Sequence, residues 1–442
     1  MRDLSSEPRV RFENTVSYSN KSVIENPWFG CYSAISAVND GIRNIESGKV
    51  DLGDDNERAL AFAKFVQGLA HGFLAVMFDK AFIFDETVDL ATDVLELQPY
   101  TEVMSAAIQQ LSKAIEISDA NSFTLPEGWI RGLTLSNTEL SQVAHSFIAR
   151  YMALVARTPT ERQNVDWSAV TTHANQGITT DFAPFGDGAD QWWSAVHWWA
   201  PQYGTWLRAD YKLIGPSDES SGYADWLATR VDDRDEFEMD TPDLRIWDQT
   251  RADDGTQNPG SQFRYTDPSP FPVARGSYHF SRYGHDRFAD YVDGGGEGPM
   301  VIFRVSELDF LKAEAMLHTD AEGNRAQIEA LIDKTRVTDG GYIPALAAGA
   351  PVGTINDPPD PKTGASLWSM LKYEKHIDLL GTFSGLGFWD RRGWGELTTK
   401  TMLHFPVPAQ DLETLQLDLY THGGGEGDSA PKLNTNHSAR VN

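Results

Sequence analysis

The apolar side chains of residues 59–78, ALAFAKFVQGLAHGFLAVMF, recur every three or four positions and constrain the fold more than any other feature. Steps such as Phe62, Phe65, Leu69 and Phe73 line one face of a helix with 3.6 residues per turn, whereas a strand requires alternation. The same spacing recurs at 100–117, 140–156, 167–177, 303–317, 325–337 and 367–380. Helices joined by short links predict an all-α fold of stacked, tetratricopeptide-like hairpins.

The helical pattern breaks off between residues 186 and 299. This stretch is rich in aromatics and in turn signals such as GPSDESSG and VDGGGEGP. A long segment without periodicity inside a globular chain is usually functional. We therefore expect four parts: helical repeats over 1–185, a loop-rich aromatic insertion over 186–299, further helical repeats over 300–420, and a flexible tail over 421–442.

Composition excludes several classes of function. The formal net charge is −27, from 64 acidic against 37 basic residues, and that field repels phosphate backbones, so we expect no nucleic-acid partner. The single cysteine, Cys31, cannot form an intramolecular disulfide. The acidic stretches lack the spacing of a calcium loop and the histidines show no HExxH, so we expect no metal and no cofactor.

The first residues, MRDLSSEPRV, are polar and lack the apolar core of a signal peptide. We find no uninterrupted apolar run of the roughly 18 residues that a membrane span needs. Two interpretations stay open: the protein is cytoplasmic, or its export signal is not part of this sequence.

Tryptophan is concentrated in DQWWSAVHWWAPQYGTW, residues 190–206. On an ideal helix Trp192 and Trp199 would lie about 20° apart, but Trp193 and Trp198 about 140° apart, so no single interior could cover all four rings. Burying one indole contributes at most about 4–6 kcal/mol, which makes several exposed rings costly unless a ligand covers them.

A sugar ring has a face of C–H groups that stacks on an indole, while its hydroxyls seek polar side chains. The segment RGSYHFSRYGHDRFADY, residues 275–291, alternates aromatics with arginines that could supply those contacts. The predicted ligand-binding residues are Trp192, Trp193, Trp198, Trp199, Tyr203, Trp206, Arg275, Tyr278 and Arg282.

Four stretches in order resemble the SusD/RagB family, surface lipoproteins that bind nutrients for bacterial uptake. They are FRVSELDFLKAEAML at 303–317, YEKHIDLLGTFSGLGFWDRRGW at 373–394, FPVPAQDL at 405–412, and the pair VAHSFIARYMAL and VDWSAVTTHANQGI within 143–178. Lys375 stands where the family often has arginine, and the lipid-anchoring cysteine is absent. Within the second stretch we expect Asp390, Arg391 and Arg392 to form an internal ion-pair network that ties the last helix to its loop.

The resemblance implies a SusD-like helical scaffold with the ligand site on the loop-rich part, and no catalytic residues. Such a protein sits at the outer-membrane surface and passes oligosaccharides, or peptides, to a TonB-dependent, SusC-like transporter. Any membrane attachment would be through a lipid anchor not present in this chain.

Two other functions stay open. An all-α glycoside hydrolase would use two carboxylates as acid and base, but no acidic pair stands out beside the aromatic run. A cytoplasmic tetratricopeptide scaffold that binds peptides would fit the polar start, but not the loop-rich centre.

Overall fold

The computed structural model describes residues 9–188, 191–202, 208–269, 281–383, 385–424 and 432–433. The chain divides into two compact units. The first combines residues 1–126, 134–178 and 391–442, and the second combines 127–133 and 179–390. Helices dominate, and the described strands form only short two-stranded antiparallel ladders. The predicted all-α class with tetratricopeptide-like hairpins is confirmed.

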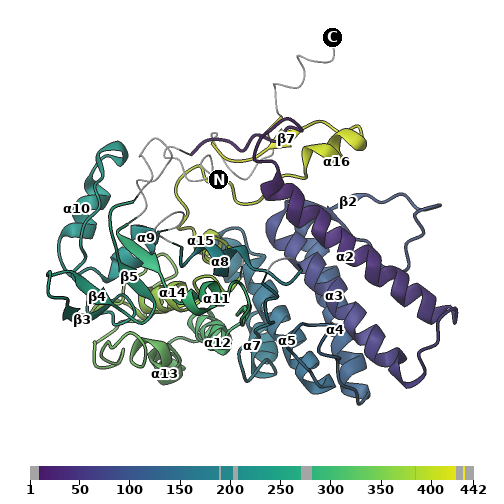
Figure 1. The fold of residues 1–442 in the computed structure, drawn as a ribbon, viewed down its shortest axis with the longest axis horizontal. Helices are drawn as coiled ribbons and strands as arrows, with labels where there is room; N and C mark the ends of the chain where they lie inside the picture. Colours follow the sequence, from purple (N-terminus) through teal and green to yellow (C-terminus); the bar gives the residue numbers. More distant parts are fainter. Residues whose placement is uncertain are drawn as a thin grey trace, which may run out of the picture. The chain divides into compact units, whose positions relative to one another are not determined.

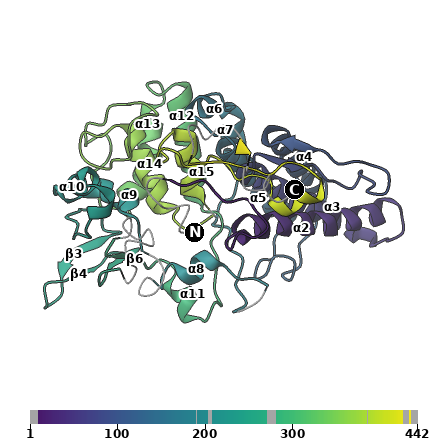
Figure 2. The ribbon, with the colours of Figure 1, turned by 90° about the horizontal axis from the view of Figure 1, so that it is seen from above.

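Long antiparallel helices form the first unit, and Figures 1 and 2 show α2, α3 and α4 side by side. Its elements are α2 (Ser22–Glu46), η1 (Gly53–Asp55), α3 (Asn56–Met77), β1 (Lys80–Phe82), β2 (Leu97–Pro99), α4 (Tyr100–Ala120), α5 (Asn137–Leu154), α6 (Pro159–Gln163), α7 (Trp167–Asn175), α16 (Ala409–Thr414), β7 (Tyr420–Thr421) and β8 (Lys432–Leu433).

Glycines on α3 allow its neighbours to approach closely. A Cβ on Gly68 would lie 2.9 Å from the main-chain oxygen of Ala107 on α4, and one on Gly72 would lie 2.1 Å from the ring of Tyr151 on α5. The Tyr151 hydroxyl in turn donates a hydrogen bond of 2.9 Å to the Leu69 carbonyl. Close packing of α3 therefore depends on its small residues as much as on its large apolar ones.

Helix α3, together with η1, is long and apolar enough to cross a membrane by length and composition, and 67% of its most apolar window is buried. Its place between α2 and α4 explains the composition, because a helix covered on several sides has no polar face.

Buried arginines satisfy the carbonyl ends of these helices. Arg157 donates to the carbonyls of Ala75 (2.6 Å) and Val76 (3.0 Å) at the end of α3. Arg392 donates to Val76 (3.0 Å) and to Leu154 (2.6 Å) at the end of α5. The last carbonyls of a helix have no intrahelical partner, so these guanidinium groups replace water there.

The second unit contains the rest of the helices and most of the loop-rich sequence. Its elements are α8 (Ala195–Trp199), α9 (Tyr211–Ile214), η2 (Gly215–Ser217), α10 (Gly222–Ala228), η3 (Val231–Asp233), β3 (Trp247–Arg251), β4 (Gln257–Pro259), β5 (Phe263–Tyr265), β6 (Tyr283–His285), α11 (Ala289–Asp293), α12 (Val305–Thr319), α13 (Arg325–Arg336) and α14 (Leu367–Asp378). Helix α15 (Leu386–Trp394) crosses the boundary between the units in the sequence.

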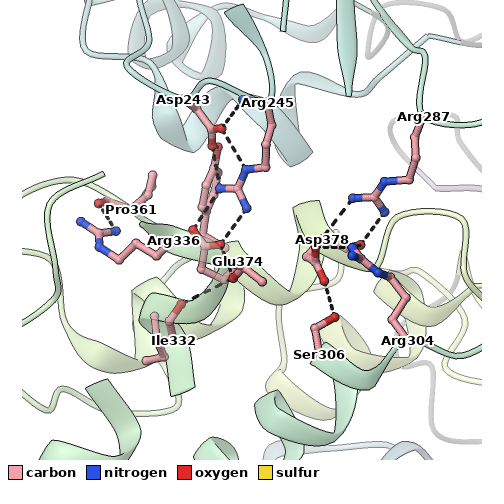
Figure 3. A network of polar contacts seen from close by, with 12 residues as sticks. Asp243, Arg245, Arg287, Arg304, Ser306, Ile332, Arg336, Pro361, Glu374 and Asp378 are labelled. Atoms are coloured by element: carbon pink, nitrogen blue, oxygen red, sulfur yellow. Dashed lines mark hydrogen bonds and ion pairs between the residues drawn. The ribbon is translucent and has the colours of Figure 1, made fainter. Parts of the chain in front are cut away.

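A buried polar network joins the loop-rich part of this unit to α14 (Figure 3). Both Nη atoms of Arg245 donate to the Glu374 carboxylate, at 2.7 and 3.0 Å, and Arg245 also pairs with Asp243 at 2.8 Å. The side chains of these three residues are fully buried. Tyr373 and Thr335 add hydroxyl donors at 2.7 Å, so the two carboxylates are well satisfied.

The ion-pair prediction for residues 390–392 needs correction. These residues lie within α15, not in a loop. Asp390 accepts a hydrogen bond of 2.8 Å from Lys375, whose ammonium also lies 3.6 Å from Glu314, whereas Arg392 donates to main-chain carbonyls. Burial accordingly lowers the pKa of Arg392.

Candidate functional site

The tryptophan-rich segment forms a shorter helix than the sequence predicted. Helix α8 begins only at Ala195, so Trp192 and Trp193 precede it, and the prediction of one rod carrying all four rings is wrong. The physical reason is the cap at Ser194, whose hydroxyl accepts a hydrogen bond of 3.3 Å from the His197 main-chain N–H. The same hydroxyl lies 2.6 Å from Nδ1 of His197.

A hydrophobic cluster formed by Phe288, Tyr291 and Met300 packs against this segment. Trp192 and Trp198 are half-buried against it. His197 is buried, with its ring centroid 4.0 Å from that of Phe288. Burial lowers the pKa of His197 to about 4, so its ring is neutral at physiological pH.

Trp193 differs from its neighbours because 40% of it is exposed. Trp199 is half-buried. Among the four described tryptophans of this segment, Trp193 therefore presents the most ring surface, and Trp192 and Trp198 present part of theirs. The structure places these four rings within one short segment, and Trp192 and Trp198 pack against the Phe288 cluster.

Glycines allow close contact between the residues that precede this segment and those at 296–298. The Gly186 N–H donates to the Gly298 carbonyl at 2.7 Å, and the Gly188 N–H donates to Gly296 at 3.2 Å. A Cβ on Gly186 would lie 2.3 Å from the Gly296 oxygen. Residues 186–188 can therefore lie this close to residues 296–298 only because Gly186 has no side chain. The run GGGEG at 294–298 thus lies directly against residues 186–188, which precede α8 in the sequence.

A cavity of about 380 Å³ lies beside α8 in the second unit. Val196 and Ala200, one turn apart, form one wall. Leu213 and the segment after α14 add most of the other apolar lining, including Leu379, Leu380, Gly381, Phe383, Leu386, Gly387 and Phe388. Gly381 has φ +83°, and a Cβ there would lie 2.7 Å from Phe288 and 3.2 Å from Val196, so glycine permits the turn that closes this wall.

The charged groups in the cavity wall are engaged with the protein. Lys375 and Asp390 form their buried ion pair there. Arg208 donates to the Asp267 carbonyl at 2.7 Å, and Asp210 caps α9 by accepting from the Lys212 N–H at 2.7 Å. The remaining wall is mainly apolar, as in most small-molecule sites.

His285 adds an aromatic edge to this wall. Its ring lies 5.1 Å from Phe263 and 5.3 Å from Phe288, centroid to centroid. Burial, assisted by the nearby Arg287, lowers the pKa of His285 far below its ordinary value. The ring is therefore uncharged and packs as an aromatic group.

The other predicted ligand-binding residues divide into two sets. Arg282 is partly exposed, donates from Nε to the Thr266 carbonyl at 3.0 Å, and lies over the Tyr265 ring at 4.7 Å. Tyr203, Trp206, Arg275 and Tyr278 lie outside the described residues. A binding role for either set stays a prediction.

Sequence reasoning missed the apolar cavity and its glycines. The signal was present in GTFSGLGF, residues 381–388, where glycine recurs among large apolar residues directly after a helix. Within the ranges that the structure describes, no group of three or more His, Cys, Asp or Glu side chains is arranged to hold a metal ion.

No protein-family model and no curated protein matches this chain. Several solved structures do match it in fold. A SusD superfamily protein from Bacteroides vulgatus is 12% identical, with a TM-score of 0.52 over 91% of this chain and 85% of that one. A SusD-like carbohydrate binding protein from Bacteroides fragilis is 13% identical, with a TM-score of 0.52 over 84% of this chain and 73% of that one.

A second SusD-like carbohydrate binding protein, from Bacteroides vulgatus, is 14% identical, with a TM-score of 0.50 over 89% of this chain and 76% of the other. At sequence identities this low, a structural match shows a shared fold and not a shared function. The resemblance inferred from the sequence motifs is confirmed at that level: the chain has the SusD-like fold.

Proposed function

We propose that this protein binds carbohydrate without catalysing a reaction, and that the segment around α8 is its binding surface. The observation that carries the proposal is the exposure of Trp193, at 40%, next to the half-buried Trp192 and Trp198. Solved proteins of similar fold are described as carbohydrate binding. An indole offers the apolar face on which the C–H face of a sugar stacks, and a rigid support limits the entropy lost on binding.

One feature of the cavity supports a binding role over a hydrolytic one. Glycoside hydrolysis requires a pair of carboxyl groups that are available to the substrate. The two carboxylates in the cavity wall are engaged elsewhere, Asp390 with the Lys375 ammonium and Asp210 with the start of α9.

Binding to Trp193 is tested by titrating a panel of neutral oligosaccharides, and a set of peptides, while recording tryptophan fluorescence and calorimetric heat. Trp193→Ala is expected to weaken binding at least tenfold with little change in melting temperature. Trp247→Ala, at another partly exposed tryptophan on β3, is the matched control and leaves affinity unchanged. The proposal fails if no oligosaccharide binds the unaltered protein, or if Trp193→Ala binds as tightly.

The proposal extends to location and partner. A protein of this kind acts at the cell surface and passes its ligand to a TonB-dependent, SusC-like transporter. Proteolysis of intact cells compared with lysed cells tests the location, and co-purification with such a transporter tests the partner. Protection of the protein in intact cells would contradict the surface location.

A further inference from the structure

The cavity beside α8 differs in chemistry from the tryptophan surface. Its volume of about 380 Å³ lies in the range of roughly 300–1,000 Å³ typical of small-molecule sites. It also exceeds the roughly 150 Å³ of an apolar cavity that is known to stay dry and to take up benzene. The space therefore accommodates a ligand group of several heavy atoms.

The wall provides little of what a sugar requires. Hydroxyl groups that enter a cavity lose water and must regain hydrogen bonds. Most of the described lining residues are aliphatic, aromatic or glycine, and Lys375, Asp390, Asp210 and Arg208 already bind protein groups. The other polar lining side chains are the imidazoles of His285 and His376. A charged ligand would have to compete for the engaged groups, and two imidazoles are too few partners for a polyhydroxylated one.

From this contrast we infer that the cavity binds a compact, uncharged, apolar group. If the protein binds carbohydrate as proposed, the group is an aryl or acyl substituent of that carbohydrate, and this identification rests on the proposed function. Helix α8 lies between the cavity and the tryptophan surface. Val196 and the following Ala200 line the cavity, and Trp198, on another side of the helix, packs on the Phe288 cluster. A substituted sugar would then place its ring on the indoles and its apolar group in the cavity.

Gly387 allows the cavity to be filled without disturbing the backbone. It lies in α15, lines the cavity, and a Cβ there would meet only Cδ2 of His376, at 3.9 Å. Gly387→Leu therefore places a side chain in open space. Ala200→Leu, at the residue that follows α8, fills the same cavity and repeats the test should Gly387→Leu fail to fold. Gly41→Leu on α2 is the matched control, because a Cβ at Gly41 has no atom within 4 Å.

The experiment compares benzene, phenyl β-D-glucopyranoside and methyl β-D-glucopyranoside as probes, using ligand-observed NMR and calorimetry. We expect benzene to bind the unaltered protein and the phenyl glycoside to bind at least tenfold tighter than the methyl glycoside. Gly387→Leu should abolish both effects, and Gly41→Leu should abolish neither.

The outcomes separate this inference from the proposed function. If oligosaccharides bind but benzene does not and the phenyl group adds no affinity, the cavity inference is overturned and carbohydrate binding stands. If benzene binds in a manner that Gly387→Leu abolishes while no sugar binds, the apolar site stands and the proposed function falls. Benzene binding that survives both cavity-filling variants also overturns the inference.

Discussion

Replacing Glu374 by glutamine tests whether the buried Arg245 network holds the second unit together. The variant keeps the shape of the side chain but removes one of the two negative charges that face the Arg245 guanidinium. Removing one partner of a buried ion pair typically costs about 3–5 kcal/mol, because the other charge stays buried. Since Asp243 still pairs with Arg245 and the amide oxygen still accepts a hydrogen bond, we expect the lower end, about 3 kcal/mol.

The assay is thermal unfolding followed by circular dichroism. A loss of about 1 kcal/mol lowers the melting temperature by about 2–4 °C in a domain of 150–250 residues, so Glu374→Gln should lower it by about 6–12 °C. The control is Glu238→Gln, which removes an exposed pair with Arg251 whose side chains are 35% and 45% exposed. Exposed pairs contribute at most about 1 kcal/mol. Equal losses for the two variants would refute the reasoning.

Two further outcomes concern the first unit. His145 and His173 share a hydrogen bond between their Nδ1 atoms, at 2.8 Å, and burial lowers the pKa of both, that of His145 to about 4. With the pKa of folded His145 at about 4, the unfolded chain binds more protons between about pH 6.5 and pH 4. Stability present above pH 6.5 is therefore lost as pH falls through this window, by at most about 1.4 kcal/mol per pH unit from His145, and His173 adds to the loss in the same direction. Denaturant titrations at several pH values check this, and a slope unchanged by His145→Phe would contradict it. Gly72→Ala places a methyl group 2.1 Å from the Tyr151 ring and should lower the free energy of unfolding by about 1–3 kcal/mol. The methyl group of Gly41→Ala on α2 meets nothing within 4 Å, so this variant should raise the free energy of unfolding by about 0.5–1 kcal/mol. The same denaturation assay distinguishes them, and a Gly72→Ala variant as stable as the unaltered protein would refute the close packing of α3.

The sequence predicted the helices well because their apolar spacing is local information. It predicted the packing face of α3 less well. Phe62 and Phe73 are only partly buried, while a Cβ at Gly68 or Gly72 would clash with the neighbouring helices. Hydrophobic periodicity indicates which side of a helix avoids water, but a small residue marks where another main chain approaches, and that depends on a partner far away in the sequence.

The tryptophan segment shows a second feature that could not be predicted from the sequence. The sequence predicted one helix whose four tryptophans point in several directions, but capping by Ser194 begins the helix after Trp193. The aromatic support comes from Phe288 and Tyr291, roughly a hundred residues later, which no local pattern connects to α8. The buried pair of Arg245 with Glu374 is likewise a contact across 129 positions, which no local pattern predicts.

The two arginine caps on the long helices have a consequence for biosynthesis. Arg392 closes the end of α5 from 238 positions further along the chain, and that of α3 from 316 positions further along. A ribosome adding about 5–20 residues per second needs roughly 10–50 s to cover the shorter of these intervals. Arg157 reaches the Val76 carbonyl at the end of α3 early in synthesis, but the Leu154 carbonyl at the end of α5 must wait for Arg392, so α5 acquires this cap among the last contacts of its unit.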